Sequence, residues 1–210
     1  MRAAALLSCG VLTLAVAWLG PLPSLAPQRF SAHMSMHMAV VAVAAPLIAL
    51  ALAGGPHDPA RRFPLLFSAV PASLVELVVV WGWHAPALHH VARASTAGLV
   101  AEQGMFLATA FLVWMSAFGD AGRPGDRAGA GVLGLLLTSM HMTLLGALLA
   151  LSPRPLYAHA GTIAPDISAL DEQHLGGAIM LLAGGVSYLA GGLALSATLL
   201  KHPSAAERLP

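Results

Sequence analysis

The sequence has a single cysteine and very little charge. Cys9 is alone among 210 residues, which excludes an internal disulfide and a metal site built from several thiolates. Only 9% of the residues are charged and 58% are hydrophobic, whereas a soluble domain carries about 25% charged residues. The net charge of +1 and the absence of a basic patch give no expectation of a nucleic-acid partner. The chain is therefore expected to be a polytopic membrane protein, one helical domain over residues 1–210 surrounded by lipid.

The sequence also lacks segments that alternate apolar and polar residues with the period of two that a membrane β-barrel requires. It contains instead six apolar runs long enough to cross a hydrocarbon core of about 30 Å. These runs lie at Ala3–Gly20, Ser31–Ala53, Pro64–Trp83, Ser95–Phe118, Ala128–Leu151 and Leu175–Leu200. Pro46 and Pro71 fall inside two of them and are expected to kink the helices. The predicted fold class is an all-α, polytopic membrane bundle of about six transmembrane helices.

The two ends of the chain have their own interpretation. Arg2, an apolar stretch and the small residues Ser24 and Ala26 fit a secretory signal with a small-x-small cleavage site. The run reaches about 17 residues and contains Trp18, which favours a retained helix. Residues 1–26 are thus expected to be the first span, with a signal sequence as the alternative, and residues 202–210 a short cytoplasmic tail.

Positive charges predict the orientation of the six runs. With the N-terminus in the cytoplasm, seven basic residues lie inside (Arg2, Arg61, Arg62, Arg123, Arg127, Lys201 and Arg208) and three outside (Arg29, Arg93 and Arg154). This favours an N-in, C-in topology. The same topology, assigned without histidine, places most histidines at the outer ends of their helices: His33, His37, His84, His89, His90, His159 and His174. Only His57 and His202 fall inside, and His141 lies within the fifth run.

The start of the second run carries the pattern most typical of a metal site. His33 and His37 are at i and i+4, so a helix directs both imidazoles from one face. Met34, Met36 and Met38 add thioethers, which with imidazole suit Cu(I). The alternative is two histidines at the membrane interface, bonded to lipid headgroups and water.

A second group, Met140, His141 and Met142, lies within the fifth run. A histidine at that depth is costly and is a functional candidate as a ligand or a proton carrier, with a hydrogen bond to a neighbouring helix as the alternative. His84 and His174 are further candidate ligands, although His174 could instead cap the last helix. His89 and His90 are expected to be solvated in a loop.

Glu76 and Glu102 are the carboxylates expected within membrane spans. A buried carboxylate must be neutral, paired or bound to a metal, because an isolated ion there is expensive. Both are predicted to balance charge or accept protons beside the metal. Protonated side chains bonded to neighbouring helices are the alternative.

Several motifs together resemble a known family. They are the HxxxH of His33 to His37, Trp83-His84-Ala85-Pro86, Glu102 ahead of Phe106, Leu145-Gly146 with Leu156-Tyr157, and Gln173-His174-Leu175-Gly176-Gly177 with Ile179-Met180. In this order they resemble the CtaG-like cytochrome c oxidase assembly proteins. The resemblance implies a non-enzymatic factor of the bacterial plasma membrane that helps to mature a haem-copper oxidase.

Combined with the donors above, the resemblance leads to a specific hypothesis. Copper, as Cu(I), would be held at the extracytoplasmic side by His33, His37, His84, His141 and His174 with Met34, Met140 and Met142. It would come from a copper donor protein or pass to an oxidase subunit.

Other classes of function stay open at this point. A b-type haem protein would use His37 and His141 as its axial pair. A small proton- or cation-coupled transporter would use Glu76, Glu102 and His141. A membrane di-iron oxygenase is poorly supported, because its paired HxxHH boxes are absent from the sequence.

Overall fold

The computed structural model describes residues 1–119, 124–157 and 167–201. Helices and their connecting turns account for all of these residues, and no strand occurs among them. The predicted all-α fold is therefore confirmed. His159, His202 and the expected tail at 202–210 lie outside the described residues.

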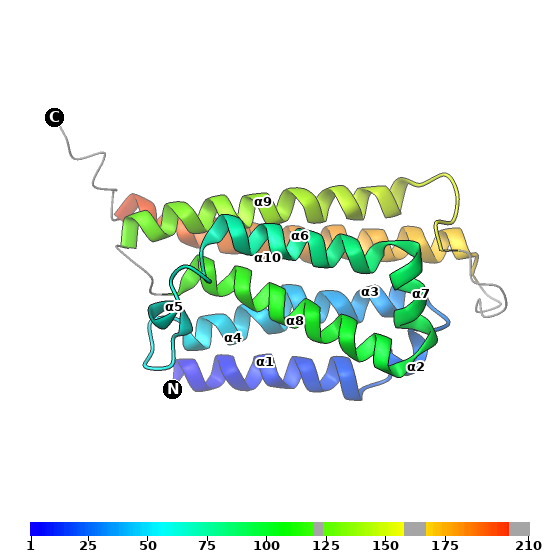
Figure 1. Ribbon diagram of the computed structural model, residues 1–210, viewed down its shortest axis with the longest axis horizontal. Coiled ribbons are helices and arrows are strands. Elements are labelled where there is room, and N and C mark those ends of the chain that lie inside the picture. Colours follow the sequence, from blue (N-terminus) through cyan, green and yellow to red (C-terminus); the bar gives the residue numbers. More distant parts are fainter. Residues whose placement is uncertain (120–123, 158–166, 202–210) are drawn as a thin grey trace.

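The long helices lie side by side in one bundle (Figure 1). In chain order the elements are α1 (Arg2–Leu19), α2 (Leu22–Leu25), α3 (Phe30–Met38), η1 (Ala39–Ala44), α4 (Ala45–Leu52), α5 (Pro59–Arg62), α6 (Ala69–His84), α7 (Pro86–Ala94), α8 (Thr96–Phe118), α9 (Pro124–Leu151) and α10 (Ala169–Lys201). The N-terminus and the end of α10 lie at the same end of the bundle, and α7 and the start of α3 lie at the other. This arrangement fits an even number of passes, while the membrane side of each end stays a prediction.

Five segments of the described chain are long and apolar enough to cross a membrane: Arg2–Leu25, Phe30–Leu52, Thr96–Phe118, Arg127–Leu151 and Ala169–Lys201. The sixth expected span is the shorter α6, with 16 residues, or about 24 Å at 1.5 Å per residue. It begins at Ala69 rather than Pro64 because residues 64–67 form turns. Pro71 consequently falls in the first turn of α6, where its missing N–H breaks no helical hydrogen bond.

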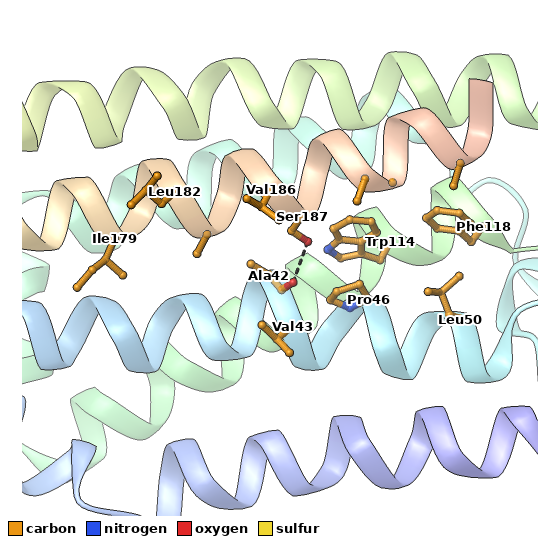
Figure 2. Close-up of a pocket in the computed structure, with 14 residues that line it drawn as sticks. Ala42, Val43, Pro46, Leu50, Trp114, Phe118, Ile179, Leu182, Val186 and Ser187 are labelled. Carbon is orange, nitrogen blue, oxygen red and sulfur yellow. Dashed lines mark hydrogen bonds between the residues drawn. The ribbon is translucent and has the colours of Figure 1, made fainter. Parts of the chain in front are cut away.

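The second span is interrupted where Pro46 removes a backbone donor. Residues Ala39–Ala44 form a π-helical turn between α3 and α4. Neighbouring helices supply two hydrogen bonds here: the Ser187 hydroxyl donates to the Ala42 carbonyl at 2.8 Å, and Trp114 Nε1 donates to the Val41 carbonyl at 3.1 Å. Figure 2 shows the Ser187 bond across an apolar groove between the second span and α10. The distortion is therefore held in place by α8 and α10.

Close packing of α9 on α10 depends on glycine. A Cβ added to Gly177 would lie 2.5 Å from the Ala150 backbone nitrogen and 2.8 Å from the Gly146 carbonyl oxygen. A Cβ on Gly185 of the same helix would meet no atom within 4 Å. Small residues at such a position let two backbones approach within a membrane.

We predict that Gly177→Ala destabilises the protein, because the added methyl group can fit only if a backbone moves. Overpacking of this kind costs about 1–3 kcal/mol, which should lower the thermal midpoint in detergent by several degrees. Gly185→Ala is the matched control and should leave the midpoint unchanged or slightly higher, because alanine favours helix. Equal midpoints for the two variants would contradict the close contact.

Candidate metal centre

The two histidines of the HxxxH motif are both fully buried on α3. This helix packs against α10, and the His33 and His37 rings point into the bundle rather than toward lipid. Their i, i+4 spacing places them on one face, as the sequence predicts. The two rings nevertheless contact different partners.

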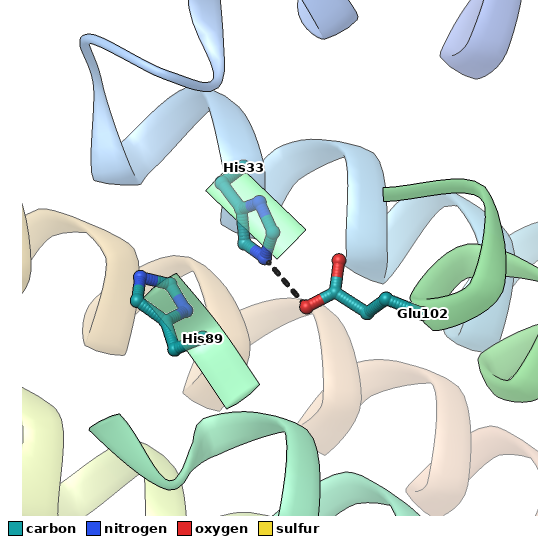
Figure 3. Close-up of side chains that lie close together, drawn as sticks. All are labelled: His33, His89 and Glu102. Carbon is teal, nitrogen blue, oxygen red and sulfur yellow. Dashed lines mark hydrogen bonds and ion pairs between the residues drawn. The ribbon is translucent and has the colours of Figure 1, made fainter. Parts of the chain in front are cut away.

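His33 lies beside Glu102 of α8 and His89 of α7 (Figure 3). His33 Nε2 is 3.1 Å from Glu102 Oε1, and the His33 and His89 ring centroids are 5.2 Å apart. One ligand atom from each of the three residues lies within 4.8 Å of the others, and all three side chains are buried. We call His33, His89 and Glu102 the outer centre.

The outer centre has the composition of a metal site. Two imidazoles and one carboxylate form a known set of three protein ligands that leaves a fourth position open. Ligand atoms on a tetrahedral ion with bonds of about 2.0–2.1 Å are about 3.3 Å apart, close to the 3.1 Å between His33 and Glu102. A ligand atom of His89 lies within 4.8 Å of those of the other two residues, so His89 would have to move toward them to complete the set.

His37 faces His84, the last residue of α6. Their ring centroids are 5.6 Å apart with planes at 61°, and Phe106 covers the pair at 4.1 Å from His37. His84 Nδ1 donates to the Val80 carbonyl at 2.7 Å. Within the described part of the chain, His84 Nε2 and both nitrogens of His37 make no hydrogen bond. We call His37 and His84 the imidazole pair.

The helix α7 brings His89 into the outer centre, which corrects the expectation of a solvated loop. Pro86 occupies its first turn, where the missing N–H is harmless. One face of α7 buries His89 and Ala92, while His90 points outward. The His89 ring packs against Tyr157 at a tilt of 36°, with centroids 4.1 Å apart, and Tyr157 stacks on Phe30 at 5.2 Å. The inward spacing of His89 and Ala92 after Pro86 is the signal in the sequence that could have revealed this helix.

Further polar contacts orient these groups. Gln103 Nε2 donates to Glu102 Oε2 at 3.1 Å, and Trp18 Nε1 of α1 donates to Gln103 Oε1 at 3.4 Å. The Tyr157 hydroxyl donates to the His84 backbone carbonyl at 2.8 Å. Burial and the charge of Glu102 raise the pKa of Tyr157, so its phenol stays protonated as this donor. These hydrogen bonds thus connect Glu102 to α1 and His84 to the segment after α9.

The start of α10 supports the site without contributing a ligand to the outer centre. Glu172 accepts from Arg29 at 3.3 Å and from the Ser31 backbone N–H at 2.8 Å, which fixes the start of α3. Gln173 donates to the Leu149 carbonyl and accepts from the Leu156 N–H. His174 Nε2 lies 2.9 Å from the carbonyl of Ser152, which directly follows α9, so this bond connects α10 to the end of α9 rather than capping the start of α10.

The predicted methionine ligands do not gather at one place. Met34 is buried and its Cγ lies close to Gly176 of α10. Met142 is buried within α9, whereas Met140 is 61% exposed. None of these methionines belongs to the outer centre or to the imidazole pair.

Glu76 and His141 lie deeper in the bundle. Thr138 of α9 donates to Ser73 of α6 at 3.0 Å, and the two helices run in the same direction (Figure 1). Glu76 and His141 each follow these bonded residues by one turn of their helices, so they lie at the same depth in the bundle. Glu76 is eight residues before His84 on α6, which corresponds to about 12 Å along the helix axis at 1.5 Å per residue. The structure therefore does not bring Glu76 or His141 to the outer centre.

Comparison with known proteins gives one match. The model of the family described as cytochrome c oxidase caa3 assembly factor (Caa3_CtaG) matches residues 1–202. No curated protein and no solved structure matches the chain. Because the match covers almost the whole sequence and agrees with the all-helical fold, the chain belongs to the Caa3_CtaG family of cytochrome c oxidase assembly factors.

Proposed function

We propose that this protein binds copper at the outer centre and delivers it to a haem-copper oxidase during assembly. Copper is cargo in this proposal, and no reaction is catalysed. The partner is an oxidase subunit, or a copper donor protein that loads the centre. The single observation that carries the proposal is the buried convergence of His33, His89 and Glu102.

The donor types suit this cargo. Imidazole nitrogen binds copper well, and Glu102 supplies a negative charge that offsets the charge of the ion. A metal ion would also satisfy the buried His33 and Glu102 groups, since an isolated charge in this environment is expensive. With no thiolate in the set, release of copper needs no change in sulfur redox state.

The position of the centre supports delivery on the extracytoplasmic side. The residues of the outer centre belong to α7 and to the first turns of α3 and α8, and α7 and the start of α3 lie at the end of the bundle opposite the N-terminus (Figure 1). With the N-in orientation expected from the positive charges, this end faces away from the cytoplasm in a bacterial plasma membrane. A partner protein approaching from that side would meet α7, whose His89 belongs to the centre.

We predict that His89→Ala removes the copper held at the outer centre, while His90→Ala does not. His89 is buried against His33, whereas its neighbour His90 is exposed on the same helix. Loss of one of three ligands should weaken binding at this centre by on the order of 100-fold or more. Anaerobic titration of the purified variants against a chromogenic Cu(I) chelator measures the change. Wild-type copper binding by His89→Ala would refute the assignment.

We further predict that the outer centre is needed for oxidase maturation in cells. A strain lacking this gene, complemented with Glu102→Gln, should assemble oxidase with less copper and lower activity, because glutamine keeps the shape of Glu102 but removes its charge. Excess copper in the medium should partly restore activity. The control is Asp171→Asn, an exposed position whose side chain bonds only locally to Ser168. Full activity with Glu102→Gln at limiting copper would count against the proposal.

A further inference from the structure

We propose that the imidazole pair, His37 and His84, is a second and separate binding site for Cu(I), one helical turn deeper than the outer centre. This inference rests on the proposed function. It assigns a site to two residues outside the three-residue outer centre, and it implies that a full-length chain holds two copper ions.

The geometry of the pair fits one shared ion. With metal–nitrogen bonds of about 2.0 Å, two imidazoles that share an ion in line between them have ring centroids about 6 Å apart. The His37 and His84 centroids are 5.6 Å apart. The separation therefore leaves room for one ion between the two rings.

The ring nitrogens of His37 and His84 are arranged to bind a ligand. His84 Nδ1 must carry the proton, because its partner at 2.7 Å is the Val80 carbonyl, which only accepts. In the neutral ring, Nε2 of His84 then has a free lone pair, and it is buried without a hydrogen bond in the described structure. Metal-binding histidines commonly have this arrangement, with the second ring nitrogen bonded to a backbone carbonyl. Both nitrogens of His37 are likewise buried without a partner among the described residues, which is costly unless a ligand satisfies them.

The surroundings of the pair select a soft monovalent ion. Phe106 is fully buried and lies 4.1 Å from His37 and 6.2 Å from His84, measured between ring centroids. Two neutral imidazoles in an apolar pocket suit Cu(I), which accepts a linear pair of ligands. Divalent zinc or cobalt needs more ligands and more negative charge than the pair supplies.

The outer centre supplies charge balance. Glu102 interacts electrostatically with His84 as well as bonding to His33. His33 and His37 are four residues apart on α3, a rise of about 6 Å. A Cu(I) ion in the pair is thus within reach of a carboxylate without being bound by it. The HxxxH motif accordingly contributes one histidine to each of two sites.

The experiment counts Cu(I) ions on the purified full-length protein in detergent, anaerobically, by competition with a chromogenic chelator. Wild type should bind two ions, and His84→Leu and His37→Leu one each. His89→Ala should also bind one ion, and the double variant His89→Ala/His84→Leu none. His37→Met replaces imidazole with a soft thioether and should keep the second Cu(I).

Zinc and thermal stability serve as controls for folding. Zn(II) should bind to the outer centre of wild type, His84→Leu, His37→Leu and His37→Met with affinities within about threefold, and it should be lost in His89→Ala. This pattern separates a missing site from an unfolded protein. The thermal midpoint of each variant checks the same point without metal.

Three results would overturn the inference. If wild type binds one Cu(I) and His84→Leu still binds it, the pair is not a site, while the proposed function stands. If His37→Leu folds normally but loses both Cu(I) and Zn(II), the histidines form a single centre. If wild type binds neither copper nor zinc, the proposed function itself fails.

Discussion

The structure depends on the contact between His33 and Glu102 inside the bundle. His33 and Glu102 have no exposed surface, and their nearest polar atoms are 3.1 Å apart. Removing an ion from water costs several kcal/mol even after the protein relaxes, so each group needs a compensating partner. The pairing fixes α3 against α8, and Gln103, Trp18 and Tyr157 are arranged around it. A metal ion held between the same groups would meet this requirement more fully than the hydrogen bond alone.

The sequence was sufficient to predict the helical fold because hydropathy acts over whole segments. Each apolar run corresponds to a helix or, for the second run, to α3, η1 and α4 in succession. The bounds differ most at α10, which begins at Ala169 rather than Leu175, and at α6, which begins at Ala69 because Pro64 lies in a turn. The HxxxH motif was predicted to direct both imidazoles from one face of a helix, since i, i+4 spacing determines a shared face, and the structure shows both side chains buried. What the spacing could not reveal is which residues from other helices meet His33 and His37.

The residues that sequence reasoning misplaced depend on depth and on tertiary neighbours. His89 follows Pro86 in a segment of only nine residues, and its burial comes from Phe30 and Tyr157, both distant in the chain. The methionines of α3 follow one another at intervals of two residues, so each successive methionine lies on the opposite side of the helix from the one before it. Met34 accordingly packs toward α10, whereas Met36 belongs to the cluster with Ala17 of α1. His141 was grouped with the outer histidines by chemistry, although its level along α9 separates it from them.

The motif at the start of α10 affects the outer centre and the imidazole pair through packing. A Cβ at Gly176 would overlap the Phe30 ring, so only glycine leaves room for Phe30 to stack on Tyr157. Tyr157 in turn packs against His89, and its hydroxyl donates a hydrogen bond to the backbone carbonyl of His84. Glu172, directly before the motif, fixes the start of α3, and Gln173 within it fixes the segment that carries Tyr157. A conformational change at α10 would therefore alter both the outer centre and the imidazole pair, which would give a docking partner a physical route to change the affinity for the proposed copper cargo.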